Sequence, residues 1–262
     1  MPATLEDTVE AMLEELVSGT PAPQPEPSRP LQDATPEALP LISVIVPANG
    51  SPKGLLNVLD RLAAAGEALH RKLGKRAEVI VTGYGEHSSR LVHAEEFDAR
   101  VVSRNLPTLS AAVNAGAAVA RGTFLVLLDP GLSPREECLC HICETLRDGE
   151  TVGGGTAVSV EDRGLASALA AFLARIPLRL NGLSLGVYFV RKHAFDSLGG
   201  FSESMLSGQT LEFALRLKRH AAATGRRLAN IKKVCATTQR GCARLSAKEW
   251  CMLLLLPLLR RS

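Results

Sequence analysis

Short apolar runs rich in β-branched residues alternate along this chain with longer amphipathic segments. The run Leu41–Pro47 is almost unbroken in its apolar character and ends in proline, which is typical of a strand buried on both faces of a parallel sheet. The next segment, Lys53–Leu73, places leucines at helical spacing with charged residues between them. Because strand followed by helix is the repeating unit of parallel sheets, the pattern predicts an α/β domain.

The alternation continues to the neighbourhood of Arg240. Apolar runs predict further strands at 77–83, 98–104, 123–129 and 152–160, one within 185–195 that leads into a helix, and a last one just before residue 239. Helical spacing predicts helices at 109–121, 134–146, 165–178 and 210–224. Gly122 is expected to end the first of these with a positive φ angle. The predicted fold is a Rossmann-like, mostly parallel, doubly wound sheet whose ligands lie beyond the carboxyl ends of its strands.

The two ends of the chain differ from this central region. Residues 1–40 combine a short helical stripe, Leu5–Leu16, with a proline-dense stretch, Pro21–Pro40, and are predicted to form a flexible tail. The stripe either binds a protein partner or docks on the chain itself. Residues 246–262 are predicted to form a C-terminal apolar and basic helix. The expected organisation is therefore a tail at 1–40, one domain at 41–245 and a terminal helix at 246–262.

The apolar run Trp250–Leu259 has too few residues to cross a bilayer, and Pro257 interrupts it. Arginines follow it directly, so it suits either a membrane interface, as in a peripheral membrane protein, or packing against the core or a second subunit. No signal peptide is legible at the start of the chain, which makes the cytoplasm, with possible association with the inner membrane face, the expected location.

Charge separates the tail from the rest of the chain. The overall net charge is +3, but residues 1–40 hold eight acidic residues and only Arg29, about −7, which leaves roughly +10 for the remainder. A mildly basic domain suits an anionic partner such as a nucleotide diphosphate or an acidic lipid surface. The basic residues are too dispersed in the sequence to indicate nucleic-acid binding.

The six cysteines are expected to be free thiols, because the long chain lacks secretory features. Four residues of types that ligate metals occur close together: Cys138, Cys140, His141 and Cys143. On a predicted helix their side chains point in different directions, whereas zinc requires ligands around one centre. Simple burial of the cysteines is the alternative interpretation.

Five short strings, in the same order, resemble family 2 glycosyltransferases over about residues 41–240. They are SVIVP at 43–47, AEVIVTG at 77–83, the NAG of 114–116 followed by ARG and LLDPG, LGVYFVRKHAFDSLGGF at 185–201, and LEFALRLKR behind it. The resemblance implies a GT-A fold that binds a nucleotide diphosphate sugar. It also implies transfer of the sugar to an acceptor, usually with Mg²⁺ or Mn²⁺ and with inversion at the anomeric carbon.

The chain departs from this family where carboxylates are expected. The resemblance implies an acidic residue after the first strand, where Ala48–Ser51 stand, and one or two aspartates after the second, where Thr82, Gly83 and Tyr84 stand. Of the metal-binding Asp-X-Asp, Asp129 remains and the second aspartate is replaced by Gly131. Sugar transfer needs a neutralised diphosphate and a base for the acceptor hydroxyl, so these losses concern the chemistry directly.

The catalytic-base pair of the family aligns with Gln209 and Thr210, followed by Glu212. Glu212 is a candidate substitute base, or simply an acid favoured in the first turn of a helix. Carboxylates from elsewhere in the chain, such as Glu136, Glu161 or Asp162, are candidates for rebuilding the site.

The remaining candidate site residues follow predicted strand ends. Asp129 is predicted at the diphosphate or metal, with a plain Asp-Pro turn as the alternative. Tyr84 is predicted to stack on a nucleotide base. The other candidates for nucleotide or diphosphate contact are Pro47, Asn49, Arg104 and Arg240.

Three functional hypotheses stay open on these residues. The first is a divergent transferase, with little or no dependence on metal, that uses Asp129 at the diphosphate. The second is a catalytically inactive relative that serves for binding or as a scaffold, and an unrelated nucleotide-binding α/β protein is the third alternative.

Overall fold

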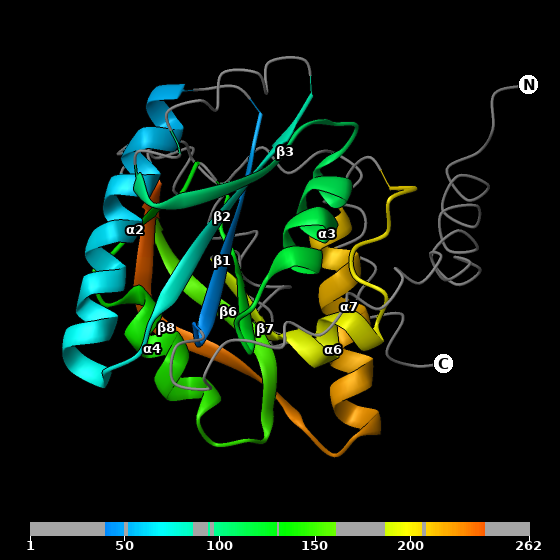
Figure 1. Ribbon diagram of the computed structural model, residues 1–262. Coiled ribbons are helices and arrows are strands. Elements are labelled where there is room, and N and C mark those ends of the chain that lie inside the picture. Colours follow the sequence, from blue (N-terminus) through cyan, green and yellow to red (C-terminus); the bar gives the residue numbers. More distant parts are fainter. Residues whose placement is uncertain are drawn as a thin grey trace, which may run out of the picture.

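The computed structural model describes residues 40–49, 52–85, 94, 97–129, 131–160, 187–205 and 208–238. Within them lies one eight-stranded sheet with helices on both faces (Figure 1). The strands are β1 (Ile42–Ala48), β2 (Ala77–Tyr84), β3 (Ala99–Leu106), β4 (Phe124–Leu127), β5 (Ser133–Pro134), β6 (Thr151–Val160), β7 (Tyr188–Arg191) and β8 (Arg227–Thr238). The helices are α2 (Pro52–Leu73), α3 (Leu109–Val119), α4 (Cys138–Leu146), α6 (Lys192–Ser197) and α7 (Gln209–Ala223).

The strand order is β3-β2-β1-β4-β7-β6-β8-β5. The first four strands are mutually parallel, and β6 also pairs in parallel with β8. Strand β7 runs antiparallel to both of its neighbours, and the two-residue β5 is antiparallel to β8. The mostly parallel α/β sheet predicted from the sequence is therefore confirmed, with β7 inserted in the opposite direction.

Strand β1 lies between β2 and β4 in the parallel half of the sheet, where both of its faces are covered. All seven are buried, and Ile42 pairs with Ala77 of β2 on one side and Phe124 of β4 on the other. Helices α2 and α4 contribute side chains to the apolar cluster on one face of the sheet, whereas α3, α6 and α7 contribute to the cluster on the other. This is a doubly wound arrangement.

The expected role of Gly122 as a helix terminator is wrong. Helix α3 begins after Thr108, whose side chain accepts a hydrogen bond from Ala111 N, and it ends at Val119. Gly122 lacks a positive φ angle, and its N–H donates to Ser43 Oγ at 2.8 Å. A Cβ atom at this position would lie 2.6 Å from Ser43 N, so close approach to β1 explains the glycine.

Helix α4 begins four residues later than predicted. Pro134 pairs with Ala236 as part of β5, and Arg135 N donates to the carbonyl of Cys235 at 2.8 Å. Proline cannot donate to a ladder and is tolerated in such a short edge strand. A turn then leads into the helix at Cys138.

The glycine run in β6 permits close packing of backbones. A Cβ atom on Gly154 would lie 1.8 Å from the carbonyl oxygen of Ala229 in β8, and one on Gly153 would lie 2.6 Å from that of Phe189 in β7. Arg191, at the end of β7, donates to the carbonyls of Thr151 at 2.7 Å and Leu146 at 2.6 Å. It thereby ties β6 and the end of α4 to β7.

The cysteine cluster predicted on a helix is buried. Cys138, Cys140 and Cys143 of α4 are free thiols packed into the core, and among the described residues no group of three His, Cys, Asp or Glu side chains could hold a metal ion. Burial raises the pKa of the Cys140 and Cys143 thiols, as expected of structural cysteines.

Three predicted segments lie outside the described residues: the tail at 1–39, the helix at 165–178 and the C-terminal run Trp250–Leu259. No helix in the described part of the chain is long and apolar enough to cross a membrane.

Candidate functional site

The carboxyl ends of β1, β2 and β4 meet at one edge of the sheet. Pro47 of β1 pairs with Thr82 of β2, and Leu128, just past β4, donates its N–H to Ile45 O at 3.0 Å. The residues that follow these pairs, Asn49 and Asp129, are both exposed. The sheet therefore gathers at one edge several of the residues that the sequence analysis placed beyond separate strand ends.

Tyr84 and Asp129 lie close enough at this edge to interact electrostatically. Burial raises the pKa of the Tyr84 phenol, and the negative charge of Asp129 raises it further. Tyr84 is half-buried and belongs to the end of β2, so its ring is held while its hydroxyl stays protonated. An aromatic face beside an exposed carboxylate offers a stacking surface and a charged ligand next to each other.

Asp129 is held by a tight turn. Its Oδ1 accepts the N–H of Gly131 at 2.6 Å, and its carbonyl accepts the N–H of Leu132 at 2.9 Å. A Cβ atom on Gly131 would lie 3.0 Å from the same Oδ1, so the turn is shaped around the carboxylate. The Asp-Pro turn and a ligand role are compatible, because only one carboxylate oxygen is needed for the turn.

Two other predicted residues, Arg104 and Arg240, lie partly or wholly outside the described part of the chain. Arg104 lies within β3, but its side chain is outside the described atoms. Arg240 follows β8 and is outside the described residues.

Glu212, the candidate base, is engaged by Arg216 one turn further along α7. Arg216 Nε donates to Oε1 of Glu212, and Nη2 donates to Oε2 at 2.8 Å. The Glu212 side chain is only 10% exposed. With both carboxylate oxygens accepting from a permanently charged guanidinium in a buried place, Glu212 has a clear structural partner.

Arg216 also fixes the turn that precedes α7. It donates to the carbonyls of Leu198 at 2.6 Å and Gly200 at 2.8 Å. Asn114 of α3 holds the other side of this turn, since its amide accepts from Phe201 N and donates to Phe201 O, both at 2.9 Å. The sequence analysis assigned neither residue a role, although the four-residue spacing of Glu212 and Arg216 is the signal for a helical ion pair.

Glu136 does not rebuild the site in the way considered from the sequence. Its carboxylate pairs with Arg71 of α2 at 2.6 Å on the α2 and α4 side of the sheet. Glu161 and Asp162 lie outside the described residues.

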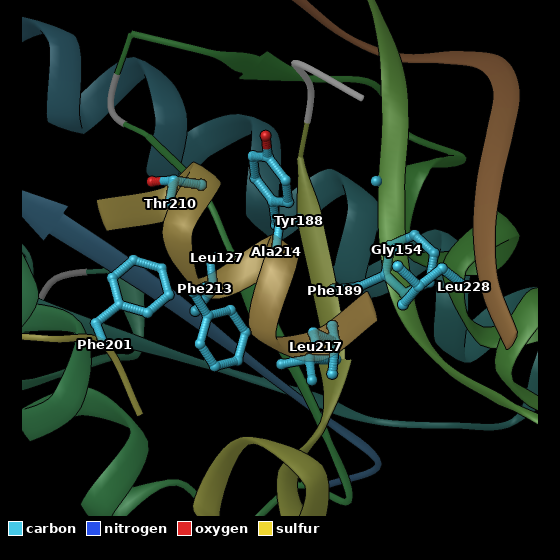
Figure 2. A pocket seen from close by; sticks show the side chains of 12 residues that line it. Leu127, Gly154, Tyr188, Phe189, Phe201, Thr210, Phe213, Ala214, Leu217 and Leu228 are labelled. Carbon is cyan, nitrogen blue, oxygen red and sulfur yellow. The ribbon is translucent and has the colours of Figure 1, made fainter. Parts of the chain in front are cut away.

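A small apolar cavity lies under the first turns of α7, between that helix and β6 and β7. Figure 2 shows Thr210 and Tyr188 on one side of it, with Phe213 and Leu217 projecting from the helix. The cavity volume is about 20 Å³, room for about one water molecule, and its lining is almost wholly apolar. It is a packing gap and has no room for a sugar.

The described residues at this edge do not form a complete metal site by themselves. Asp129 is the one carboxylate that the strand ends of β1, β2 and β4 supply in the described part of the chain. Mg²⁺ usually takes one or two protein carboxylates together with substrate phosphates. The donor set therefore fits a divalent ion only when a diphosphate brings further ligands.

A doubly wound, mostly parallel α/β sheet with an aspartate turn beyond β4 has the architecture of the GT-A class of glycosyltransferase folds. The family model for glycosyl transferase family 2 matches residues 43–189, and this chain belongs to that family. No curated protein matches the chain.

Solved structures support the same fold. S. aureus TarS 1–349 in complex with UDP-GlcNAc superposes with a TM-score of 0.56 at 16% identity, covering 83% of this chain and 66% of that one. Glucosyl-3-phosphoglycerate synthase from Mycobacterium tuberculosis, in complex with Mn²⁺, UDP and phosphoglyceric acid, gives a TM-score of 0.56 at 19% identity, covering 84% and 78%. The TarS 1–349 structure without that ligand is matched over 64% of its length, so this chain spans just under two thirds of that relative.

Proposed function

We propose that this protein binds a nucleotide diphosphate sugar at the edge formed by β1, β2 and β4, and transfers the sugar to an acceptor. The observation that carries the proposal is that the parallel strands β2 and β4 flank β1 and bring Tyr84 and Asp129 to the same edge of the sheet. Tyr84 supplies a ring on which a nucleotide base stacks, while Asp129 lies where the diphosphate would enter. Family membership and fold relatives solved with UDP or UDP-GlcNAc support a donor of this class.

The proposed role of Asp129 is to hold a divalent ion jointly with the diphosphate. Such an ion would neutralise charge on the leaving diphosphate. Because the described edge offers one carboxylate, we expect no measurable Mn²⁺ binding without nucleotide and only a modest effect of Mn²⁺ on nucleotide affinity. Asn49, Pro47, Arg104 and Arg240 remain proposed contacts of the donor.

A second candidate function is nucleotide-sugar binding without turnover. The observation that favours it is the Glu212–Arg216 pair, because a carboxylate that already accepts from a guanidinium with both oxygens is a poor proton acceptor for a hydroxyl. Under the transferase proposal, a substrate group or a residue outside the described ranges assists the acceptor instead.

The deciding experiment is calorimetric titration of the protein with UDP and with GDP, each with and without Mn²⁺, followed by an assay for sugar release from a panel of donors. Asp129→Asn should remove the Mn²⁺ enhancement of nucleotide binding and reduce any sugar release by roughly 10²-fold or more. Tyr84→Ala should weaken nucleotide binding by about 1–3 kcal/mol, the usual contribution of base stacking on an aromatic side chain, whereas Tyr84→Phe should retain most of it.

Asp60→Asn, on an exposed position of α2, is the matched control for loss of one negative charge. Nucleotide binding without release of sugar from any donor would favour the binding-protein candidate. Absence of binding to both nucleotides would contradict both candidates.

A further inference from the structure

In the described connections between helices and strands, most of the basic residues lie at the edge of the sheet opposite the candidate site. We propose that the acidic N-terminal segment of this chain, residues 1–39, docks on this edge. The surface is defined by six exposed side chains at the amino ends of the parallel strands and is called the basic edge below: Lys75, Arg76, Arg100, Arg121, Arg147 and Arg226.

Strand pairing places these residues next to one another, although they are spread over about 150 positions of the sequence. Ile42 pairs with both Ala77 and Phe124, which brings Arg76 and Arg121 to the two sides of β1. Arg191 pairs with Phe124, and Thr151 pairs with Arg227, which continues the same edge across β7 and β6 to β8. Figure 1 shows these helix-to-strand connections gathered at the lower end of the molecule.

Internal pairing neutralises only part of the charge at this edge. Arg227 pairs with Asp148 at 2.6 Å, and Lys192 pairs with Asp196 at 3.0 Å, so these four charges cancel. The acids that remain near the six residues of the basic edge are Glu78, Asp98, Glu144 and Glu150, and Arg191 adds one more positive charge. Seven positive charges against four negative charges leave a net charge of about +3 at the basic edge.

The described part of the opposite edge has no comparable group of cations. In the described parts of its connections, after β1, β2, β3 and β4 and between α6 and α7, the charged residues are Asp129 and Glu203. Among the described connections, the basic edge is therefore the one that attracts an acidic segment. Docking of the tail at the basic edge would leave the candidate site open.

The tail joins the domain within the basic edge. Leu41 N donates to the carbonyl of Arg76 at 2.9 Å, and the carbonyl of Leu41 accepts from Phe124 N at 3.1 Å, next to the loop that carries Arg121. The segment that precedes Leu41, residues 1–39, has eight acidic residues and one arginine. Covalent attachment keeps this charge at a high effective concentration beside its complement, so individually weak contacts suffice.

Zero-length carbodiimide crosslinking of the full chain tests the proposal, with the linked peptides identified by mass spectrometry. Carboxylates of residues 1–39 should link mainly to Lys75, with Lys192 second, and only weakly to Lys232 and Lys233 on the exposed part of β8. The Lys75 links should fall several-fold between about 0.05 M and about 1 M salt, where the screening length shrinks to roughly 3 Å.

Reversal of charge at the basic edge, by Arg76→Glu, Arg121→Glu and Arg226→Glu together, should also reduce the Lys75 links several-fold. The matched control reverses three exposed charges elsewhere, by Arg61→Glu, Lys232→Glu and Lys233→Glu, and should leave these links unchanged. Equal linking to all lysines, or links that are insensitive to salt, would overturn the proposal. Links found only between isotopically labelled and unlabelled copies would overturn it in favour of docking between two chains.

Discussion

Arg216 connects acceptors from two parts of the chain: both carboxylate oxygens of Glu212 in its own helix, and the carbonyls of Leu198 and Gly200 in the preceding turn. Gly200 has a φ angle of 69°, and a Cβ atom there would lie 2.6 Å from Asn114 Oδ1, so the turn is held from both sides. The position and the negative charge of Glu212 are thus explained by structure alone.

Glu212→Gln should therefore destabilise the fold more than it affects the site. The variant loses the charge of a buried partner of Arg216, and hydrogen bonds to charged groups contribute about 1.5–3 kcal/mol. We expect a loss of that order in the free energy of unfolding, measured by urea denaturation, and unchanged affinity for nucleotide. A variant of normal stability that has lost sugar transfer would instead identify Glu212 as a catalytic residue.

Asp148 gives the stability a dependence on acid pH. Its carboxylate accepts from Arg227 at 2.6 Å and from the N–H and hydroxyl of Thr151, and these bonds hold its pKa well below the usual range. Because the pKa is lower in the folded than in the unfolded state, the stabilisation is fully present above roughly pH 4 to 5 and is lost as the pH falls further. The difference in denaturation midpoint between wild type and Asp148→Asn should therefore be full at pH 6, start to shrink below about pH 4 and still be partly present at pH 3. A constant difference between the two proteins across this range would show that the charge of Asp148 is unimportant.

At the level of the elements, the tightest contact is between β6 and its neighbours. A side chain on Gly154 cannot be accommodated without separating β6 from β8, because the obstacle is the backbone carbonyl of Ala229. Gly66 of α2 is the opposite case, since nothing lies within 4 Å of a Cβ atom added there.

Gly154→Ala should consequently destabilise by about 3 kcal/mol or more, at the upper end of overpacking costs. Gly66→Ala should stabilise by up to about 1 kcal/mol through helix propensity. Thermal denaturation of the two variants beside wild type measures both effects. If the melting temperatures of both variants differed only slightly from that of wild type, β6 and β8 would not pair as described.

The elements themselves were largely predictable, and the reasons for the failures are local. Helix α2 and strand β1 have strong periodic patterns and occur where the sequence placed them. The start of α4 was misplaced because Pro134 suits both a first helical turn and an edge strand. Its strand partner, Ala236, lies about a hundred residues away in the sequence, so no local pattern reveals the pairing. Gly122 was misinterpreted for a similar reason, since its neighbour Ser43 belongs to a distant strand.

At the scale of the whole molecule, the parallel half of the sheet followed from the alternation of strands and helices, but the insertion of β7 did not. Nothing in the four residues Tyr188–Arg191 specifies that they run antiparallel between β4 and β6. The charge distribution was also invisible along the sequence. Cations that looked dispersed come together at the basic edge only because the amino ends of the parallel strands meet there.

The sequence predicted that the candidate residues share one edge of the sheet, but it did not predict their contacts. Residues after strand ends must lie at the carboxyl edge of a parallel sheet, and Asn49 and Asp129 lie there together with Pro47 and Tyr84. The partner of Glu212 is decided by side-chain geometry, which a pattern of residue types does not contain.

The parallel pairing of β6 with β8 bears on where this protein can be divided. The match to the family model ends at residue 189, yet β8, which borders β6 from Thr151 to Val160, lies wholly beyond that point. A chain cut at that boundary would lose Phe213 and Leu217 from the core and uncover one whole side of the interior strand β6. We therefore expect a piece of this chain that ends at residue 189 not to fold by itself, although the family model stops there.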